Sequence, residues 1–246
     1  DSVALPPEAQ QMAKDIIKKI APQILPDTHP TYKSKSGAQE AHEAIRPTDP
    51  TRTPDDVKRY LDRDGRRLYE LIWLRFMAGQ MKPAIYDTTT IDFELEGDHR
   101  YLFRATGSVL RFDGFTRLYR EAREEGDRRT LHDLEPLPSL EVDETAALKA
   151  IEPNQHFTQP PSRYTEASLV KELEQKGIGR PSTYAQIIST LRDRKYVEMD
   201  RKRFMATPLG ETVAKVLVRI FPDLFDTGFT SEMEEELDRI EEGELD

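Results

Sequence analysis

Residues 159–191 read QPPSRYTEASLVKELEQKGIGRPSTYAQIISTL, and this stretch predicts two short helices separated by a glycine break. Apolar residues recur at helical spacing over residues 166–175, and Gly177 follows as a typical C-terminal stop. The second helix is predicted to begin at Pro181, because proline is favoured in the first helical turn. A hairpin with a basic turn over residues 196–206 and a further helix over 208–220 come next. The order helix, turn, helix, hairpin, helix is typical of a winged-helix-like unit.

The chain before this unit changes its hydrophobic period twice. Residues 1–83 carry apolar residues at three- and four-residue spacing and are predicted to be mainly helical. A helix over residues 65–80 is apolar over most of its surface and is expected to be buried. Residues 84–160 contain alternating runs such as 89–96, which are typical of strands. We therefore predict an α+β chain in three parts: helical residues 1–83, a β-rich segment over 84–160, and a winged-helix-like unit with an acidic tail over 161–246.

Charge is unevenly distributed along the chain. The 246 residues carry a formal net charge of −10. Residues 230–246 contain nine acids and one arginine and contribute −8 of that total, whereas residues 163–204 contain ten Lys or Arg and six Asp or Glu, a local +4. Because electrostatic fields are screened over about 8–10 Å in physiological salt, the acidic total does not exclude a polyanionic partner such as nucleic acid.

Composition and motif searches exclude several classes of protein. The chain has no cysteine, which excludes disulfides, thiolate metal sites and a cysteine nucleophile. No apolar run approaches the roughly 18 residues of a membrane span, and no signal-peptide pattern opens the chain. There is no Walker A loop, HExxH or GxSxG motif. The acids of residues 234–238 are expected to lie around a helix as a solvated face rather than to form a metal site. We expect a soluble, cytoplasmic protein with no membrane partner.

Arg180 precedes the proline that begins the second helix of the quoted stretch. A residue before proline is pushed into an extended conformation, so we expect Arg180 to project away from the helix. Free N–H groups at residues 182–184, the hydroxyls of Ser182 and Thr183 and the positive helix end would form a phosphate site, to which Arg180 adds a two-point grip. The alternative is a well-capped helix with Arg180 in a surface ion pair.

His42 and Arg46 lie four residues apart in SGAQEAHEAIRPTDP, residues 36–50. If a short helix covers this region, as we predict for residues 37–45, the two side chains share a face. An imidazole beside a guanidinium suits gripping a phosphodiester, because one group donates a proton or hydrogen bond while the other holds the anion. The alternative is a half-buried histidine beside a surface arginine that Glu40 and Glu43 neutralise.

These two stretches resemble the type IA DNA topoisomerases, in particular the bacterial topoisomerase I branch. The resemblance covers essentially the whole chain and is carried by QEAHEAIRPT at 39–48 and PPSRYTEASLVKELEQKGIGRPSTYAQIIS at 160–189. The stretches IWLRFMAGQMKPAIYDTTT at 72–90 and ATGSVLRFDGF at 105–115 are also similar to that family. A single histidine in HEAIRP resembles topoisomerase I more than topoisomerase III, whereas reverse gyrase shares much of this core and is not distinguished.

The resemblance implies an enzyme that relaxes negatively supercoiled DNA without ATP. In this family a tyrosine attacks one strand to form a 5′-phosphotyrosine, the other strand passes through the gap, and Mg²⁺ is bound by acids of a Toprim domain. Asp1 and Ser2 match the end of the family's Tyr-Met-Arg-Thr-Asp-Ser motif. We therefore expect the nucleophile and the Mg²⁺ ligands to lie outside this chain, which would bind DNA without cutting it and hold no cofactor of its own.

Within this chain the resemblance assigns supporting roles to two groups of residues. His42 and Arg46 would help to hold the phosphate near the tyrosine. The single strand would be bound by Arg163, Tyr164, Arg180, Ser182 and Thr183. The β-rich segment would form the arch around the hole through which DNA passes, and the protein is expected to be a monomer that prefers single-stranded DNA.

A non-enzymatic winged-helix DNA-binding module is the alternative function. It accounts for residues 163–220 and their basic hairpin but not for HEAIRP or for the segment 84–160. A reader of duplex DNA should prefer double strands and show base selectivity in the major groove. A strand-gripping topoisomerase part should prefer single strands with little sequence readout.

Overall fold

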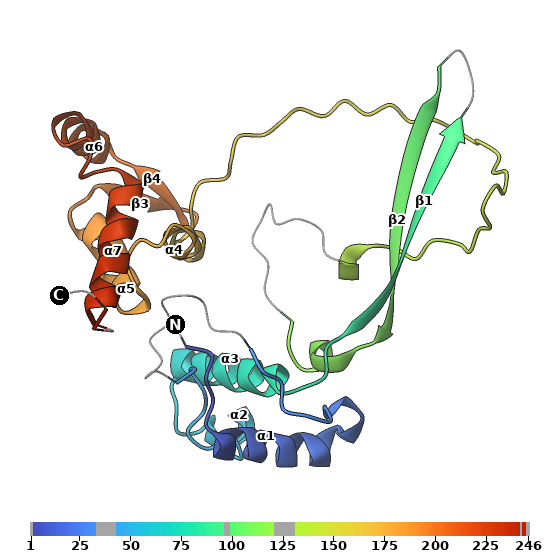
Figure 1. Cartoon of the computed structure of the whole chain (residues 1–246), viewed down its shortest axis with the longest axis horizontal. Coiled ribbons are helices and arrows are strands. Elements are labelled where there is room, and N and C mark those ends of the chain that lie inside the picture. Colours follow the sequence, from blue (N-terminus) through green and yellow to red (C-terminus); the bar gives the residue numbers. More distant parts are fainter. Residues whose placement is uncertain (1, 33–42, 96–98, 121–130, 242, 245–246) are drawn as a thin grey trace. The chain divides into compact units, whose positions relative to one another are not determined.

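The computed structural model describes residues 2–32, 43–95, 99–120, 131–241 and 243–244. The described chain divides into two compact units, one formed between Val3 and Gln155 and the other from His156 onward, and both can be followed in Figure 1. Helices and strands are both present, which confirms the predicted α+β class. None of the helices in the described ranges has the length and apolar character that a membrane crossing requires. The division at residues 83 and 160 stays a prediction.

Helices α1 (Pro7–Ile20) and α3 (Arg63–Gly79) supply most of the core of the first unit. The main buried apolar side chains are Ala9, Ala13, Ile17, Ile24, Trp73, Phe76, Met77 and Met81. Asp62 caps α3, because its carboxylate accepts a 2.7 Å hydrogen bond from the N–H of Gly65. The expectation that this helix is buried on most of its surface is wrong, since Leu68 and Leu71 are 58% and 48% exposed. The helix packs by one face only.

Short helical segments lie between these two helices and after the two strands that follow them. The 3₁₀ turn η1 (Pro22–Ile24) follows α1, and α2 (Pro54–Val57) precedes α3. Thr53 and Asp56 form a reciprocal capping box at the start of α2. Two further 3₁₀ turns, η2 (Gly114–Arg117) and η3 (Leu131–Asp133), lie after the strands.

Strands β1 (Ile85–Leu95) and β2 (Tyr101–Phe112) form one long antiparallel ribbon, as the alternation over residues 89–96 predicts. Opposite residues include Phe93 with Phe103 and Asp92 with Arg104. The guanidinium of Arg104 donates two hydrogen bonds of 2.7 and 2.8 Å to the carboxylate of Asp92. Such cross-strand pairs stabilise a ribbon that has no second layer of its own among the described residues.

The segment after η3 crosses β2 at a glycine. A Cβ on Gly107 would lie 2.5 Å from the carbonyl oxygen of Glu135 and 2.6 Å from the side chain of Leu137. The absence of a side chain therefore lets two stretches of backbone approach closely. The described residues between η3 and α4 form no helix or strand, so β1 and β2 lie in the first part of the segment 84–160 predicted to be β-rich.

The second unit has the element order predicted for residues 166–220. Helices α4 (Glu166–Gln175) and α5 (Pro181–Asp193) precede strands β3 (Val197–Asp200) and β4 (Arg203–Ala206), and α6 (Pro208–Ile220) follows. Arg201 and Lys202 form the hairpin turn with φ of 45° and 66°. Two consecutive left-handed residues match the twist of a tight hairpin. A Cβ on Gly210 in α6 would lie 2.1 Å from the carbonyl oxygen of Tyr196, so α6 packs directly on the start of the hairpin.

The last helix, α7 (Thr227–Glu241), turns a polar side towards the rest of the second unit. Ser231, Glu234 and Asp238 are half-buried and recur at helical spacing. The large apolar side chains of α7 lie on a more exposed stripe, at 41–54% exposure: Phe229, Met233, Leu237 and Ile240. The most buried described side chains of α7 are thus polar, and the helix contacts the rest of the unit through hydrogen bonds and charges as well as through half-covered apolar groups.

Candidate nucleic-acid interface

The connection between α4 and α5 is a tight turn that depends on two glycines. Gly177 and Gly179 have φ of +66° and +71°. The N–H of Ile178 donates to the carbonyl of Leu173, so α4 ends in a Schellman motif with Gly177 at the left-handed position. The predicted stop at Gly177 is confirmed. This turn fixes where the backbone of Arg180 enters the next helix.

Arg180 begins α5 as its N-cap, with the extended backbone that a following proline imposes (φ −134°, ψ 165°). The hydroxyl of Thr183 accepts a hydrogen bond from the N–H of Arg180 and donates one to its carbonyl. The N–H groups of Thr183 and Tyr184 also donate to that carbonyl, at 2.8 and 3.2 Å. The prediction of free N–H groups at 182–184 is therefore wrong for residues 183 and 184. The exposed Ser182 keeps its N–H and hydroxyl free of partners among the described residues.

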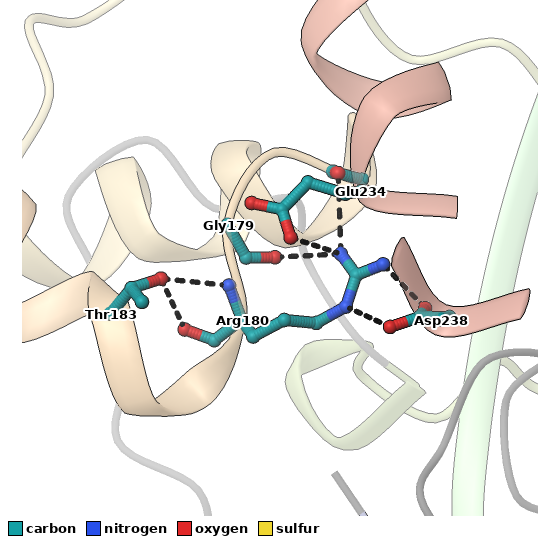
Figure 2. A network of polar contacts seen from close by, with 6 residues as sticks. Gly179, Arg180, Thr183, Glu234 and Asp238 are labelled. Atoms are coloured by element: carbon teal, nitrogen blue, oxygen red, sulfur yellow. Dashed lines mark hydrogen bonds and ion pairs between the residues drawn. The ribbon is translucent and has the colours of Figure 1, made fainter. Parts of the chain in front are cut away.

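The side chain of Arg180 turns towards α7 instead of projecting away from the protein, as Figure 2 shows. Its Nη2 and Nε donate to the two carboxylate oxygens of Asp238, at 2.6 and 3.4 Å. Its Nη1 donates to the carbonyls of Gly179 and Gly177, at 2.9 and 3.4 Å, and lies 3.8 Å from Glu234. The expected outward projection is wrong. Arg180 forms an ion pair, as in the alternative interpretation, but this pair is half-buried and does not lie at the surface.

This ion pair is partly shielded from water. The side chains of Arg180, Glu234 and Asp238 are 25%, 22% and 20% exposed. The hydrogen bond to Asp238 raises the pKa of the Arg180 guanidinium above its ordinary value; the charges of Asp238 and Glu234 act in the same direction against the effect of burial. Arg180 is therefore a permanent cation in a fixed position.

Arg163 and Tyr164 lie beside strand β4. The N–H of Phe204 donates a 2.7 Å hydrogen bond to the carbonyl of Tyr164, and the guanidinium of Arg203 donates to the carbonyl of Arg163 at 3.1 Å. Both predicted residues have exposed side chains. The side chain of Arg163 has no hydrogen bond or ion pair within the described ranges, and so its charge is available to an outside anion. Their backbone positions are set by the hairpin.

Arg46 lies in the first unit on a segment that is not helical. Residues 43–47 have no helical structure, so the predicted helix over 37–45 is wrong for its described end. The N–H of Ala44 instead donates a 2.8 Å hydrogen bond to the carbonyl of Ala4. The Arg46 guanidinium donates to Glu43 at 2.9 and 3.2 Å and to the carbonyl of Pro47 at 3.3 Å. His42 lies outside the described residues.

The structure brings together residues that the sequence did not link. The pairing of Arg180 with Asp238 joins residues 58 apart, and only the four-residue spacing of Glu234 and Asp238 on one helix hints at a shared target. No group of three or more His, Asp or Glu in the described ranges could hold a metal ion. What the site offers is hydrogen-bond donors and positive charge for an anion, at Arg163, Ser182 and the turn beside Arg180.

Comparisons with known proteins agree over the whole chain. A family model described as DNA topoisomerase matches residues 1–246. DNA topoisomerase 1 of Vibrio cholerae is 47% identical over 246 residues, which are 100% of this chain and 27% of that protein. DNA topoisomerase 1 of Rickettsia conorii is also 47% identical, over 100% of this chain and 31% of that protein.

A solved structure shares the fold. Full-length topoisomerase I from Thermotoga maritima superposes with a TM-score of 0.75 at 33% identity. The match covers 100% of this chain and 38% of that one. The chain thus spans well under half the length of the relatives that it matches.

Proposed function

This chain belongs to the bacterial type IA DNA topoisomerases, and from that premise we propose that it is a distal part of a catalytic core that relaxes negatively supercoiled DNA. In the reaction a tyrosine hydroxyl attacks one phosphodiester and becomes a 5′-phosphotyrosine, while the released 3′-hydroxyl later attacks it to reseal the strand. One phosphodiester replaces another of similar energy, so no ATP is required. The tyrosine and the Mg²⁺ ligands lie outside this chain in this proposal.

One hydrogen bond carries the assignment of the first unit. Ala44, in the middle of HEAIRP, donates from its N–H to the carbonyl of Ala4 at 2.8 Å. By resemblance, Asp1 and Ser2 end the tyrosine motif, so the HEAIRP segment contacts Ala4, which would lie seven residues after the nucleophile. This supports the proposal that His42 and Arg46 contact the phosphate that the tyrosine attacks.

The second unit supplies the grip on the strand in this proposal. Ser182 presents an N–H and a hydroxyl at the positive end of α5, and Arg163 presents a charge with no partner in the described part of the chain, beside the exposed ring of Tyr164. Together they provide anion contacts and a stacking surface, the combination that binds single strands without reading sequence. Arg180 keeps one N–H of Nη2 without a partner among the described residues, which allows a single contact to a phosphate oxygen.

A competition experiment tests the preference for single strands. The 246-residue chain is titrated into a fluorescent oligothymidylate, and unlabelled single-stranded or duplex DNA of equal length is added. We expect single strands to compete more strongly, and log K to fall with log salt by about 0.7 per phosphate contacted. The winged-helix alternative, which the order α4 to α6 favours, requires the opposite preference and dependence on duplex sequence.

A plasmid experiment tests whether DNA cleavage requires parts of the enzyme outside this chain. The chain is incubated with Mg²⁺ and supercoiled plasmid, and separately with a labelled oligonucleotide, beside a complete topoisomerase I as the positive control. We expect no relaxation and no covalent protein–DNA band after denaturation, because the nucleophile is missing. A covalent band would identify one of the nine tyrosines of this chain as the nucleophile and overturn the proposal.

A further inference from the structure

We propose that Glu234 and Asp238 of α7 are positioning residues, which hold the Arg180 guanidinium and through it orient the first turn of α5 for strand binding. The proposal rests on the function proposed above, since it gives the acidic helix a role in the same site. The net charge of α7 would by itself repel DNA, so its contact with Arg180, a residue of the proposed binding site, requires an explanation. The contacts around Arg180 provide it.

Helix α7 contacts the turn between α4 and α5 at more than one point. Ser231 packs against Gly177 so closely that a Cβ on the glycine would lie 2.5 Å from its hydroxyl oxygen. One and two helical turns further along, Glu234 and Asp238 reach Arg180. All three α7 residues are half-buried on one side of the helix. The polar side of α7 therefore follows the turn from Gly177 to Arg180.

The hydrogen bonds of Arg180 connect α7 to this turn. Nε and Nη2 grip Asp238, while both Nη1 hydrogens point to the carbonyls of Gly177 and Gly179, as Figure 2 shows for the labelled residues. These carbonyls precede the helix that carries Ser182. Four of the five guanidinium N–H groups are thus used inside the protein, which leaves too few for a two-point grip on a phosphate.

The charge of the two carboxylates matters for this role. Removing one partner of a partly shielded ion pair leaves the other charge without compensation, and the freed group then seeks water. Without Asp238, the guanidinium is expected to swing outward and release the two glycine carbonyls. The residues at the N-terminus of α5 would then sample other orientations. Contacts with DNA that require Ser182 in one fixed position would be weakened.

The variants Asp238→Asn and Glu234→Gln test the proposal, with Glu235→Gln as the matched control. All three substitutions remove one negative charge from the same helix, but Glu235 is exposed and has no hydrogen bond or ion pair to a described residue. By simple electrostatics each substitution should strengthen binding to DNA. If Asp238 positions Arg180, Asp238→Asn should instead weaken binding to DNA. The direction of the change in affinity therefore distinguishes the two effects.

The first measurement needs no DNA. Amide hydrogen exchange is followed at Ile178, Thr183 and Tyr184, whose N–H groups are hydrogen-bonded within or beside the turn. We expect exchange there to rise about tenfold in Asp238→Asn, in line with the loss of a charge-assisted hydrogen bond, and to rise less in Glu234→Gln, where the contact is 3.8 Å. The amide of Phe221, bonded to Leu217 at the end of α6, reports whether the unit as a whole has been destabilised.

The second measurement is the affinity for oligothymidylate. We expect Asp238→Asn to bind several-fold more weakly than wild type and Asp238→Glu to recover part of the loss, whereas Glu235→Gln binds equally well or better. Unchanged exchange at the turn in Asp238→Asn would overturn the proposal whatever the affinities are. In Asp238→Asn, amide exchange at the turn could rise while the affinity for oligothymidylate increases as in Glu235→Gln. That result would overturn the link between the turn and strand binding.

The two proposals fail in different ways. If the wild-type chain does not bind oligothymidylate at all, the proposed function is wrong. The role of the turn in strand binding is then wrong as well. The exchange data still decide whether the carboxylates hold the turn. If wild type binds and Asp238→Asn binds as tightly with a loosened turn, the function stands and the positioning role is wrong.

Discussion

The indole N–H of Trp73 donates a 2.8 Å hydrogen bond to the carbonyl of Pro50, and both residues are buried. This contact joins α3 to the segment that follows HEAIRP. It therefore connects the core of the first unit to the position of Arg46, four residues before Pro50. Since the chain has one tryptophan, the contact is accessible to a single substitution.

Trp73→Phe should destabilise the first unit by about 1–3 kcal/mol, because a buried carbonyl loses the one side-chain donor that it has among the described residues. The change is measured by urea denaturation followed by circular dichroism. Tyr69→Phe is the control: it removes a 2.7 Å hydrogen bond to the carbonyl of Arg52 at a half-buried site and should cost less. Equal stability of Trp73→Phe and wild type would show that the Pro50 carbonyl finds another donor.

Gly210→Ala should destabilise the second unit by about 1–3 kcal/mol or more, the range for overpacking. The new Cβ would lie 2.1 Å from the backbone oxygen of Tyr196, which cannot move without shifting β3. Gly79→Ala in α3 is the contrasting variant, since a Cβ at this position would lie 4.0 Å from its nearest neighbour, the hydroxyl oxygen of Tyr32. That change should be neutral or stabilise by up to about 1 kcal/mol through helix propensity. Thermal unfolding of both variants checks the contrast.

Arg46→Ala should weaken binding of single-stranded DNA by about 1.5–3 kcal/mol if Arg46 contacts a phosphate. Glu43→Gln should strengthen binding, because Glu43 is the acid that pairs with Arg46. Arg52→Ala is the matched control, as Arg52 carries the same charge nearby and pairs with Asp49 at the surface. Fluorescence anisotropy gives the three affinities. A loss in Arg52→Ala as large as in Arg46→Ala would indicate a general charge effect.

His42→Ala in the complete enzyme should slow cleavage or religation by roughly 10²–10⁴, the range for a lost proton or hydrogen-bond donor. Single-turnover cleavage and religation assays measure this change. The melting temperature should stay the same, since the prediction assigns His42 to chemistry. Full activity, or a loss that parallels unfolding in calorimetry, would favour the alternative of a structural histidine.

Acid should loosen the β1–β2 ribbon at one identifiable pair. The hydrogen bonds from Arg104 hold the pKa of Asp92 below its ordinary value of 3.8. A carboxylate with a lowered pKa stabilises the folded state above its unfolded pKa, and this contribution is lost as the pH falls through the folded pKa. The protection of amides across the ribbon, relative to their intrinsic exchange rates, should therefore fall below about pH 4, near the ordinary carboxylate pKa. Asp92→Asn should remove that part of the pH dependence.

The sequence predicts the local features of this fold, but it does not predict the contacts between residues that are far apart in the chain. Gly177 and Pro181 mark the ends of α4 and α5 because glycine and proline restrict the backbone directly. Strand β1 follows from the strict alternation over residues 89–96. The exposure of Leu68 on α3 does not follow from its apolar character, since periodicity cannot say how many faces of a helix find a partner.

The candidate site shows the same limit. That Arg180 is extended before a proline is local and correct, but the direction of its side chain depends on Asp238, 58 residues further along. Likewise, the hydrogen bond of Ala44 to Ala4 joins two backbone groups, and backbone groups leave no trace in residue type. Residue chemistry identifies groups that can bind an anion, and only tertiary contacts show which of them are already engaged.

The polar attachment of α7 has a consequence for temperature. Hydrophobic contacts weaken on cooling, because apolar hydration carries a large heat capacity. The contact of α1 with α3 is of that kind, whereas Ser231, Glu234 and Asp238 attach α7 through polar groups and the apolar side chains of α7 stay about half exposed. Separation of α7 from the turn should thus involve a small change in heat capacity. We therefore expect the turn that leads into α5 to lose less support on cooling than the apolar core between α1 and α3.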